Sequence, residues 1–209
     1  MAPRVAVIYY SATGHTHRLA EALAAGAAEA GAEVRLRRVR ELAPQAAIAG
    51  NPAWQEHVAA ASAVPEAALE DLEWAEGLAF GSPTRYGMIA AQLKQFLDMT
   101  GPLWQQGELA DKVVTSFTGA STAHGGHETT LLSLSAVYAH WGAVIVPLGY
   151  TDPAVFATGN PYGSTWLSGR GEGPDPLTLR VAAHQGARLA RWAGRAVLDP
   201  APADARAGA

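Results

Sequence analysis

Five short apolar runs, separated by segments with helical spacing, constrain the fold of this chain more than any other feature. The first run is apolar throughout, as in a strand buried on both faces of a parallel sheet, and the second alternates polar and apolar residues, as in a half-exposed strand near a sheet edge. This alternation predicts a doubly wound α/β fold, a parallel sheet of five strands in the order 2-1-3-4-5. The runs lie at residues 4–10, 33–39, 77–80, 112–117 and 143–148.

The segments between the strands carry the helical spacing. Residues 41–64 have no clear period, and we interpret them as a partly helical surface excursion that could serve subunit contacts. The glycine-rich stretch 149–176 is longer than loops usually run without a purpose. Helices are expected at residues 17–30, 67–72, 89–97, 128–141 and 177–198.

The composition is that of one globular domain. A chain of 209 residues, 49% hydrophobic and 16% charged, can bury one sizeable core and is too short for two ordinary domains. We predict one domain over residues 1–198. The low-complexity tail 199–209 is predicted to be disordered.

Several classes of function are disfavoured by composition. The chain has no cysteine, which excludes disulfides, thiolate catalysis and zinc-thiolate sites. Its formal charge of −4 provides no electrostatic reason to bind nucleic acid. No apolar run approaches the roughly 20 residues that span a bilayer, and nothing before the first strand resembles a signal peptide. We therefore expect a cytoplasmic protein without membrane insertion.

The loop after the first strand reads Ser11-Ala12-Thr13-Gly14-His15-Thr16. Its three hydroxyls, free backbone N–H groups and the positive end of the following helix dipole predict a phosphate site. The loop has no lysine and fits neither the nucleotide-triphosphate loop nor the dinucleotide fingerprint. A single phosphomonoester therefore suits it better than a polyphosphate with magnesium. An ordinary capped helix is the alternative interpretation.

Two more loops of small residues follow the third and fourth strands, at residues 81–87 and 118–126. In a doubly wound sheet of this order, ligands bind outside the carboxyl ends of the strands, at the switch point between strands one and three. All three loops lie at that end of the sheet. The topology therefore predicts a site there independently of the phosphate motif.

Motifs along the chain resemble those of one family. Ser82-Pro83-Thr84-Arg85-Tyr86-Gly87 follows the third strand, and Thr100-Gly101-Pro102-Leu103-Trp104 lies further along. Ala139-His140-Trp141-Gly142 and Asn160-Pro161-Tyr162-Gly163 continue the pattern. With the phosphate loop, they resemble the flavodoxin-like NAD(P)H:quinone oxidoreductases, the WrbA family, from Val5 to about Val197.

The resemblance implies a flavodoxin-like fold that binds FMN. The first loop would hold the phosphate, the second would line the isoalloxazine and the third would run along the other edge of the ring. Trp104 and His140 would be the catalytic residues, forming the wall over the flavin where the substrate binds. The implied cofactor-binding residues are Ser11, Ala12, Thr13, Gly14, His15, Thr16, Pro83, Thr84, Arg85, Tyr86, Gly87, Thr118, Gly119, Ala120, Ser121, Thr122, Ala123, His124 and His140.

Other interpretations of these residues stay open. Arg85 could supply positive charge near flavin N1 or be a surface arginine, Trp104 could be a core residue, and His140 could simply end a helix. We predict no metal site, because His124, His127 and His140 lack cysteine and paired carboxylate partners. Members of the family commonly have an aromatic residue at the position of Thr13, so we expect the nicotinamide contacts here to be weaker or differently built.

The resemblance implies that two electrons pass from NADH or NADPH through FMN to a quinone. One alternative is a reductase for which FMN is a released substrate, and another is a module that carries electrons on FMN without a nicotinamide. The family also implies a homotetramer. The aromatic residues of 149–176 would then form a contact between chains or a lid over their own subunit; they are Tyr150, Phe156, Tyr162 and Trp166.

Overall fold

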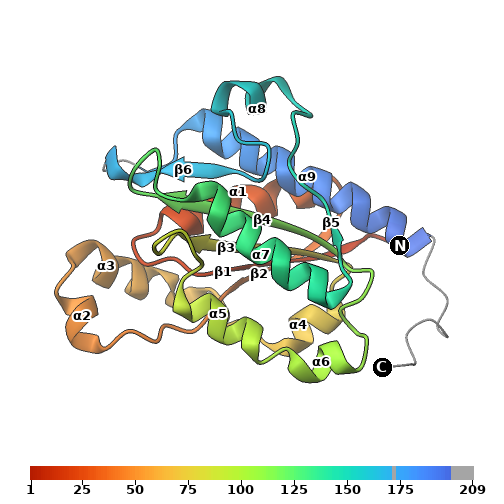
Figure 1. The fold of residues 1–209 in the computed structure, drawn as a ribbon, viewed down its shortest axis with the longest axis horizontal. Helices are drawn as coiled ribbons and strands as arrows, with labels where there is room; N and C mark the ends of the chain where they lie inside the picture. Colours follow the sequence, from red (N-terminus) through yellow and green to blue (C-terminus); the bar gives the residue numbers. More distant parts are fainter. Residues whose placement is uncertain (171–172, 199–209) are drawn as a thin grey trace.

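A parallel sheet forms the centre of the computed structural model, which describes residues 1–170 and 173–198 (Figure 1). The strand order β2-β1-β3-β4-β5 confirms the predicted topology. Each neighbouring pair along this path is parallel. The strands are β1 (Arg4–Tyr9), β2 (Glu33–Arg38), β3 (Gly77–Pro83), β4 (Val113–Ala120) and β5 (Val144–Ile145).

Burial in the first two strands follows their sequence patterns. Residues Val5 to Tyr9 of β1 are all buried, because β1 lies between β2 and β3 and has helices on both faces. No residue of β2 is fully buried, since this strand is at the edge of the sheet. The alternating pattern of residues 33–39 therefore marks an edge strand, as predicted.

Helices cover both faces of the sheet (Figure 1). One apolar cluster joins α1 and α9 to one face, and a second joins α4, α5, α6 and α7 to the other. Helices α1 and α9 pack closely, since a Cβ on Gly26 would lie 1.9 Å from the carbonyl oxygen of Ala183. The helices are α1 (His15–Glu29), α4 (Leu69–Trp74), α5 (Ala91–Asp98), α6 (Gly101–Gln105), α7 (His127–Trp141) and α9 (Pro176–Leu198).

The excursion between β2 and α4 is partly helical, as expected. It contains α2 (Gln45–Ala49), α3 (Pro52–Ala60) and a 3-10 turn, η1 (Ala61–Ala63). Helix α3 starts at Asn51-Pro52, where the Asn51 side chain accepts a hydrogen bond from the backbone N–H of Trp54. An asparagine cap followed by proline is a favourable helix start.

The predicted boundaries on the far side of β4 are wrong in three places. The fifth strand ends at Ile145 rather than 148, near Pro147, which has no N–H to continue the ladder. Stretch 149–176 is not a plain loop, because it contains α8 (Pro153–Thr158), β6 (Thr165–Leu167) and the 3-10 turn η2 (Ser168–Arg170). Strand β6 pairs with residues 118–120. Those three residues therefore belong to β4, and the loop begins at Ser121.

The tail 199–209, predicted to be disordered, lies outside the described residues. The domain boundary at residue 198 stays a prediction. Within residues 1–170 and 173–198, no helix combines the length and apolar character needed to cross a membrane.

Candidate functional site

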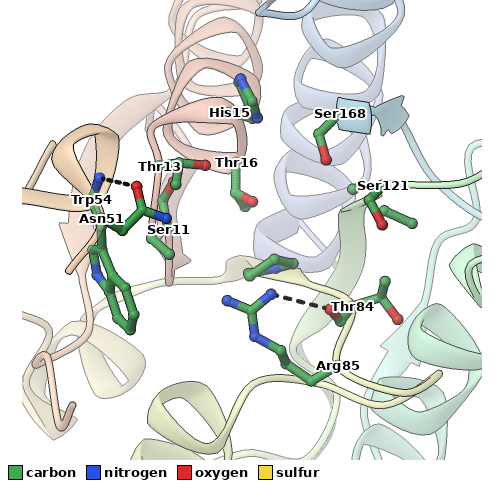
Figure 2. Close-up of a pocket in the computed structure, with 14 residues that line it drawn as sticks. Ser11, Thr13, His15, Thr16, Asn51, Trp54, Thr84, Arg85, Ser121 and Ser168 are labelled. Atoms are coloured by element: carbon green, nitrogen blue, oxygen red, sulfur yellow. Dashed lines mark hydrogen bonds between the residues drawn. The ribbon is translucent and has the colours of Figure 1, made fainter. Parts of the chain in front are cut away.

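The three predicted loops meet in one pocket at the carboxyl ends of β1, β3 and β4 (Figure 2). Parallel strands bring their carboxyl ends to the same edge, so loops separated by a hundred residues of sequence become neighbours. The cavity has a volume of about 280 Å³. It is lined by Ser11, Ala12, Thr13, His15, Thr16, Asn51, Trp54, Pro83, Thr84, Arg85, Gly119, Ala120, Ser121 and Ser168.

The loop after β1 has the geometry that the prediction of an anion site requires. Gly14 adopts a left-handed conformation with φ 90°, which glycine tolerates best, and its N–H donates to the Ser11 hydroxyl at 3.1 Å. Among the residues that the structure describes, no side chain caps the first turn of α1. The N–H groups of this turn are therefore open to a ligand, beside the hydroxyls of Thr13 and Thr16 that line the pocket.

The loop after β3 presents an arginine and turns back sharply. Arg85 and Met88 exchange backbone hydrogen bonds of 2.7 and 3.0 Å, with Tyr86 and Gly87 at positive φ between them, as in a two-residue hairpin turn. Tyr86 is fully exposed and neither it nor Gly87 is among the lining residues. Only Pro83, Thr84 and Arg85 of this loop line the pocket.

Arg85 brings positive charge to the site. Figure 2 shows its guanidinium turned into the pocket. Its one side-chain hydrogen bond there is to the carbonyl oxygen of Thr84 at 3.4 Å. Among the ion pairs of the described residues, none involves Arg85. This charge is therefore available to an anionic ligand, which argues against a surface arginine paired with a neighbouring carboxylate.

Hydrogen bonds of Thr84 and Thr118 connect the loops after β3 and β4 to neighbouring elements. The Thr84 hydroxyl lies 2.7 Å from that of Thr130 in α7, and the Thr84 N–H donates to the carbonyl oxygen of Gly119 at 2.8 Å. The Thr118 hydroxyl donates to the carbonyl oxygen of Ser82 at 2.6 Å. Thr118 is fully buried beneath the pocket, so it supports the lining rather than forming it.

The third loop contributes its first part to the pocket. Gly119, Ala120 and Ser121 line the cavity, whereas Thr122, Ala123 and His124 are not among the lining residues. The chain turns at this point, because the carbonyl oxygen of Thr122 accepts a hydrogen bond from the N–H of Gly125 at 3.0 Å. Within one chain, Ser121 is therefore the last residue of this loop that lines the pocket.

Trp104 and His140 lie close to one another but away from the pocket. The Trp104 indole N–H donates to the carbonyl oxygen of His140 at 2.8 Å. His140 precedes Gly142, whose carbonyl oxygen accepts from the N–H of Asp111 before β4. The pocket lies at the other end of β4, about 23 Å away at 3.3 Å per residue. Trp104 is 54% exposed, so it is not a core residue.

Three lining residues were not predicted. Asn51 and Trp54 come from the excursion, and Ser168 comes from the stretch that was expected to be a loop. The Asn51-Pro52 pair is a local signal for a helix start. No local signal places that helix beside the pocket, because the contact is made across the fold.

The histidines beside the phosphate loop are held neutral. Burial, reinforced by the neighbouring His17, lowers the pKa of His57 to about 4. Burial and the positive charge of Arg18 also lower the pKa of His15. The ring of His57 packs on that of His17 with 5.4 Å between centroids. A phosphate here would therefore be bound mainly by N–H groups and hydroxyls rather than by a charged imidazole.

Comparisons with known proteins agree with this geometry. Residues 3–152 match the family described as NADPH-dependent FMN reductase. The chain belongs to this family. FMN is its expected cofactor, and the residues present fit it: an uncapped helix N-terminus with three hydroxyls suits the phosphate, and an unpaired arginine suits the anionic reduced ring.

Relatives within this family carry a more specific name. A protein named NAD(P)H dehydrogenase (quinone) from Deinococcus radiodurans is 47% identical over 163 residues, covering 78% of this chain and 82% of the relative. One with the same name from Sinorhizobium fredii is 40% identical over 200 residues, covering 92% and 98%. These relatives confirm the resemblance to the quinone oxidoreductases.

A solved structure confirms the fold. The flavodoxin, WrbA-like protein from Agrobacterium tumefaciens superposes with a TM-score of 0.67 at 26% identity. The match covers 92% of this chain and 98% of the other. The predicted flavodoxin-like fold therefore extends over nearly the whole of this chain.

Proposed function

We propose that this chain is an FMN-dependent oxidoreductase that transfers two electrons from NADH or NADPH to a quinone. One observation carries the proposal: the loops after β1, β3 and β4 meet in a single pocket beside the uncapped N-terminus of α1. The names of the relatives, NAD(P)H dehydrogenase (quinone), support the same reaction.

The residues of the chain bind and orient the cofactor. The hydroxyls and N–H groups of Ser11 to Thr16 hold the phosphate, and Arg85 offsets negative charge on the reduced ring. FMN, when bound, supplies the chemistry, since it accepts a hydride and returns two electrons. Pro83 and Gly119 to Ser121 shape the slot for the ring, and no side chain need act as a nucleophile.

Trp104 and His140 reach a pocket only in an assembly. In one chain α6 and the end of α7, which carry these two residues, lie at the opposite end of β4 from the pocket (Figure 1), so we propose that a second copy brings them over the flavin, within a D₂ homotetramer. Large apolar side chains are exposed in the loop after β3, at Tyr86 and Met88, and in α6, at Trp104. Exposed apolar surface of this kind marks contacts between chains.

A second candidate function is the one in the family description, reduction of FMN as a released substrate by NADPH. The exposure of Arg85 and Thr13 at the mouth of the pocket favours it. Retention of FMN separates the two functions. Purified protein that keeps its yellow colour through dialysis holds FMN as a cofactor, and colourless protein that consumes NADPH only with added FMN uses it as a substrate.

The experiment that tests the main proposal is anaerobic. NADH or NADPH is added to the FMN-loaded protein, and the absorption of the flavin is followed. We expect bleaching, then full recovery when benzoquinone is added. Bleaching without recovery would exclude the quinone as acceptor, and no bleaching with either nucleotide would leave an electron carrier as the better description.

The cellular setting is also part of the proposal. We place the protein in the cytoplasm, where NADH, NADPH and FMN are available. Its formal charge of −4 supports small-molecule partners over nucleic acid.

A further inference from the structure

Residues 41–64, here called the pocket wall, are fastened to the sheet through the carboxylate of Glu41. One carboxylate oxygen accepts hydrogen bonds from the Tyr10 hydroxyl and the Trp54 indole N–H, both at 3.0 Å. The other accepts from the Gln92 amide at 2.7 Å and from the N–H groups of Leu42 and Ala43 at 2.9 Å. Five neutral donors thus satisfy one negative charge.

These donors keep the carboxylate charged. Burial by itself would raise the pKa of Glu41, but the hydrogen bonds from Ala43, Gln92, Trp54 and Tyr10 outweigh burial and lower it. Hydrogen bonds to a charged group are stronger than those between neutral groups. Glu41 therefore links the end of β1, helix α5 and the pocket wall.

The pocket wall is also attached at two other points. His57 of α3 lies against the phosphate loop, 3.4 Å from the position a Cβ on Gly14 would take. The Arg38 guanidinium donates to the carbonyl oxygen of Val64 at 3.0 Å. The wall is therefore packed on its own subunit at its start, middle and end.

Trp54 is the part of the wall that faces the ligand. It lines the cavity with Asn51, on the side opposite Ser121 and Ser168 (Figure 2). The one polar hydrogen of its side chain is donated to Glu41. What remains for a ligand is the apolar face of the indole, which can contact an aromatic ring system but offers an anion no donor.

We propose that Trp54 contacts the isoalloxazine ring of FMN and that Glu41 is a positioning residue that holds the indole in place. This inference rests on the proposed function, because it assumes a flavin in the pocket. Residues 41–64, which we interpreted from the sequence as a possible subunit contact, would then bind the cofactor within their own chain.

The test compares FMN with riboflavin, which lacks the phosphate. For Trp54→Ala we expect both dissociation constants to rise by the same factor, about 3- to 10-fold, as for the loss of one aromatic contact. Trp54→Phe keeps a ring but loses the donor to Glu41, and we expect a smaller, equal loss for both flavins. Trp192→Ala, an exposed tryptophan on α9, is the matched control and should change neither.

Two measurements test Glu41. The loss of flavin affinity caused by Glu41→Gln should disappear when Trp54 is already alanine, as coupled residues show in a double-mutant cycle. The quenching of tryptophan fluorescence by FMN should decrease in Trp54→Phe and Glu41→Gln but not in Trp192→Phe. Thermal unfolding checks that each variant folds. If Glu41→Gln does not fold, the comparison of Trp54→Phe with the parent protein reports on the same hydrogen bond, because the phenyl ring has no donor for Glu41.

Several results would overturn the inference. Unchanged affinity for both flavins in Trp54→Ala, or a loss confined to FMN, would remove Trp54 from the ring site. Additive losses in the cycle would remove the positioning role of Glu41. The parent protein is measured first, because binding of neither flavin would defeat both proposals, whereas flavin binding without quinone turnover would defeat the proposed function alone.

Discussion

Single residues divide the pocket into an end for an anion and an end for a ring. Thr13 and Thr16 line the pocket beside the open first turn of α1. Trp54 and Arg85 lie further from that turn (Figure 2). In the proposed complex the hydroxyls contact the phosphate and the indole face contacts the ring, so variants at the two ends should differ in how they discriminate FMN from riboflavin.

The Thr13→Ala, Thr16→Ala double variant should lose affinity for FMN only. Each hydroxyl would donate one hydrogen bond to a charged phosphate, worth about 1.5–3 kcal/mol, so the FMN dissociation constant should rise at least about 100-fold while that of riboflavin stays the same. Isothermal titration with both flavins measures this. Thr158→Ala, whose hydroxyl bonds within α8, is the control. An equal loss for both flavins would mean that the loop does not hold the phosphate.

At the scale of elements, α3 carries a half-buried histidine that the fold holds without charge. His57 packs between the phosphate loop and His17, and its pKa in the folded protein is about 4 against about 6.5 in an unfolded chain. Between these values the unfolded state binds the extra proton. Stability therefore rises with pH across this window and is lost as pH falls through it.

We expect the free energy of unfolding to decrease from pH 6.5 to pH 4, and His57→Asn to reduce this dependence. Asparagine keeps a polar side chain but does not titrate in this range. Urea unfolding at a series of pH values gives the slope for each protein. His140→Asn, at the other end of the sheet, serves as the comparison. Equal slopes in parent and His57→Asn proteins would show that other groups cause the acid sensitivity.

At the scale of the whole molecule, exposed aromatic side chains support the proposed assembly of several chains. Tyr150, Phe156 and Tyr162 are 48%, 67% and 46% exposed. Tyr150 and Phe156 stack with 4.8 Å between centroids. Trp166 instead packs partly buried against the core, and Ser168 beyond it lines the pocket. The stretch 149–176 thus combines a contact with its own pocket and an outward aromatic surface.

Trp104→Ala should keep FMN and lose quinone turnover. The indole lies too far from its own pocket to hold the cofactor there, and in the proposed tetramer it meets the substrate of a neighbouring chain. Steady-state kinetics, with flavin content and sedimentation measured on the same samples, test this. Full quinone reductase activity of a monomer at micromolar concentration would contradict the tetramer, and unchanged turnover in the variant would remove Trp104 from the site.

The sequence by itself determined the sheet, its order and the edge at which the pocket opens. These follow from local patterns: the buried run of β1, the alternation in β2 and the small-residue loops after three strands. The geometry of the proposed phosphate loop was also predictable, because its hydroxyls, its glycine and the start of α1 are contiguous in the chain.

Tertiary structure alone decided the rest of the pocket. Trp54 and Asn51 lie at the pocket because Glu41 accepts hydrogen bonds from Tyr10 and Gln92, which are 31 and 51 positions away in the sequence. No local sequence pattern predicts contacts over such separations. The loop after β4 begins at Ser121 because β6, formed 45 residues later, extends the ladder. The positions of Trp104 and His140 away from the pocket were also set by tertiary packing. Local spacing determines which face of a helix or strand a residue occupies, but packing between distant elements determines what that face contacts.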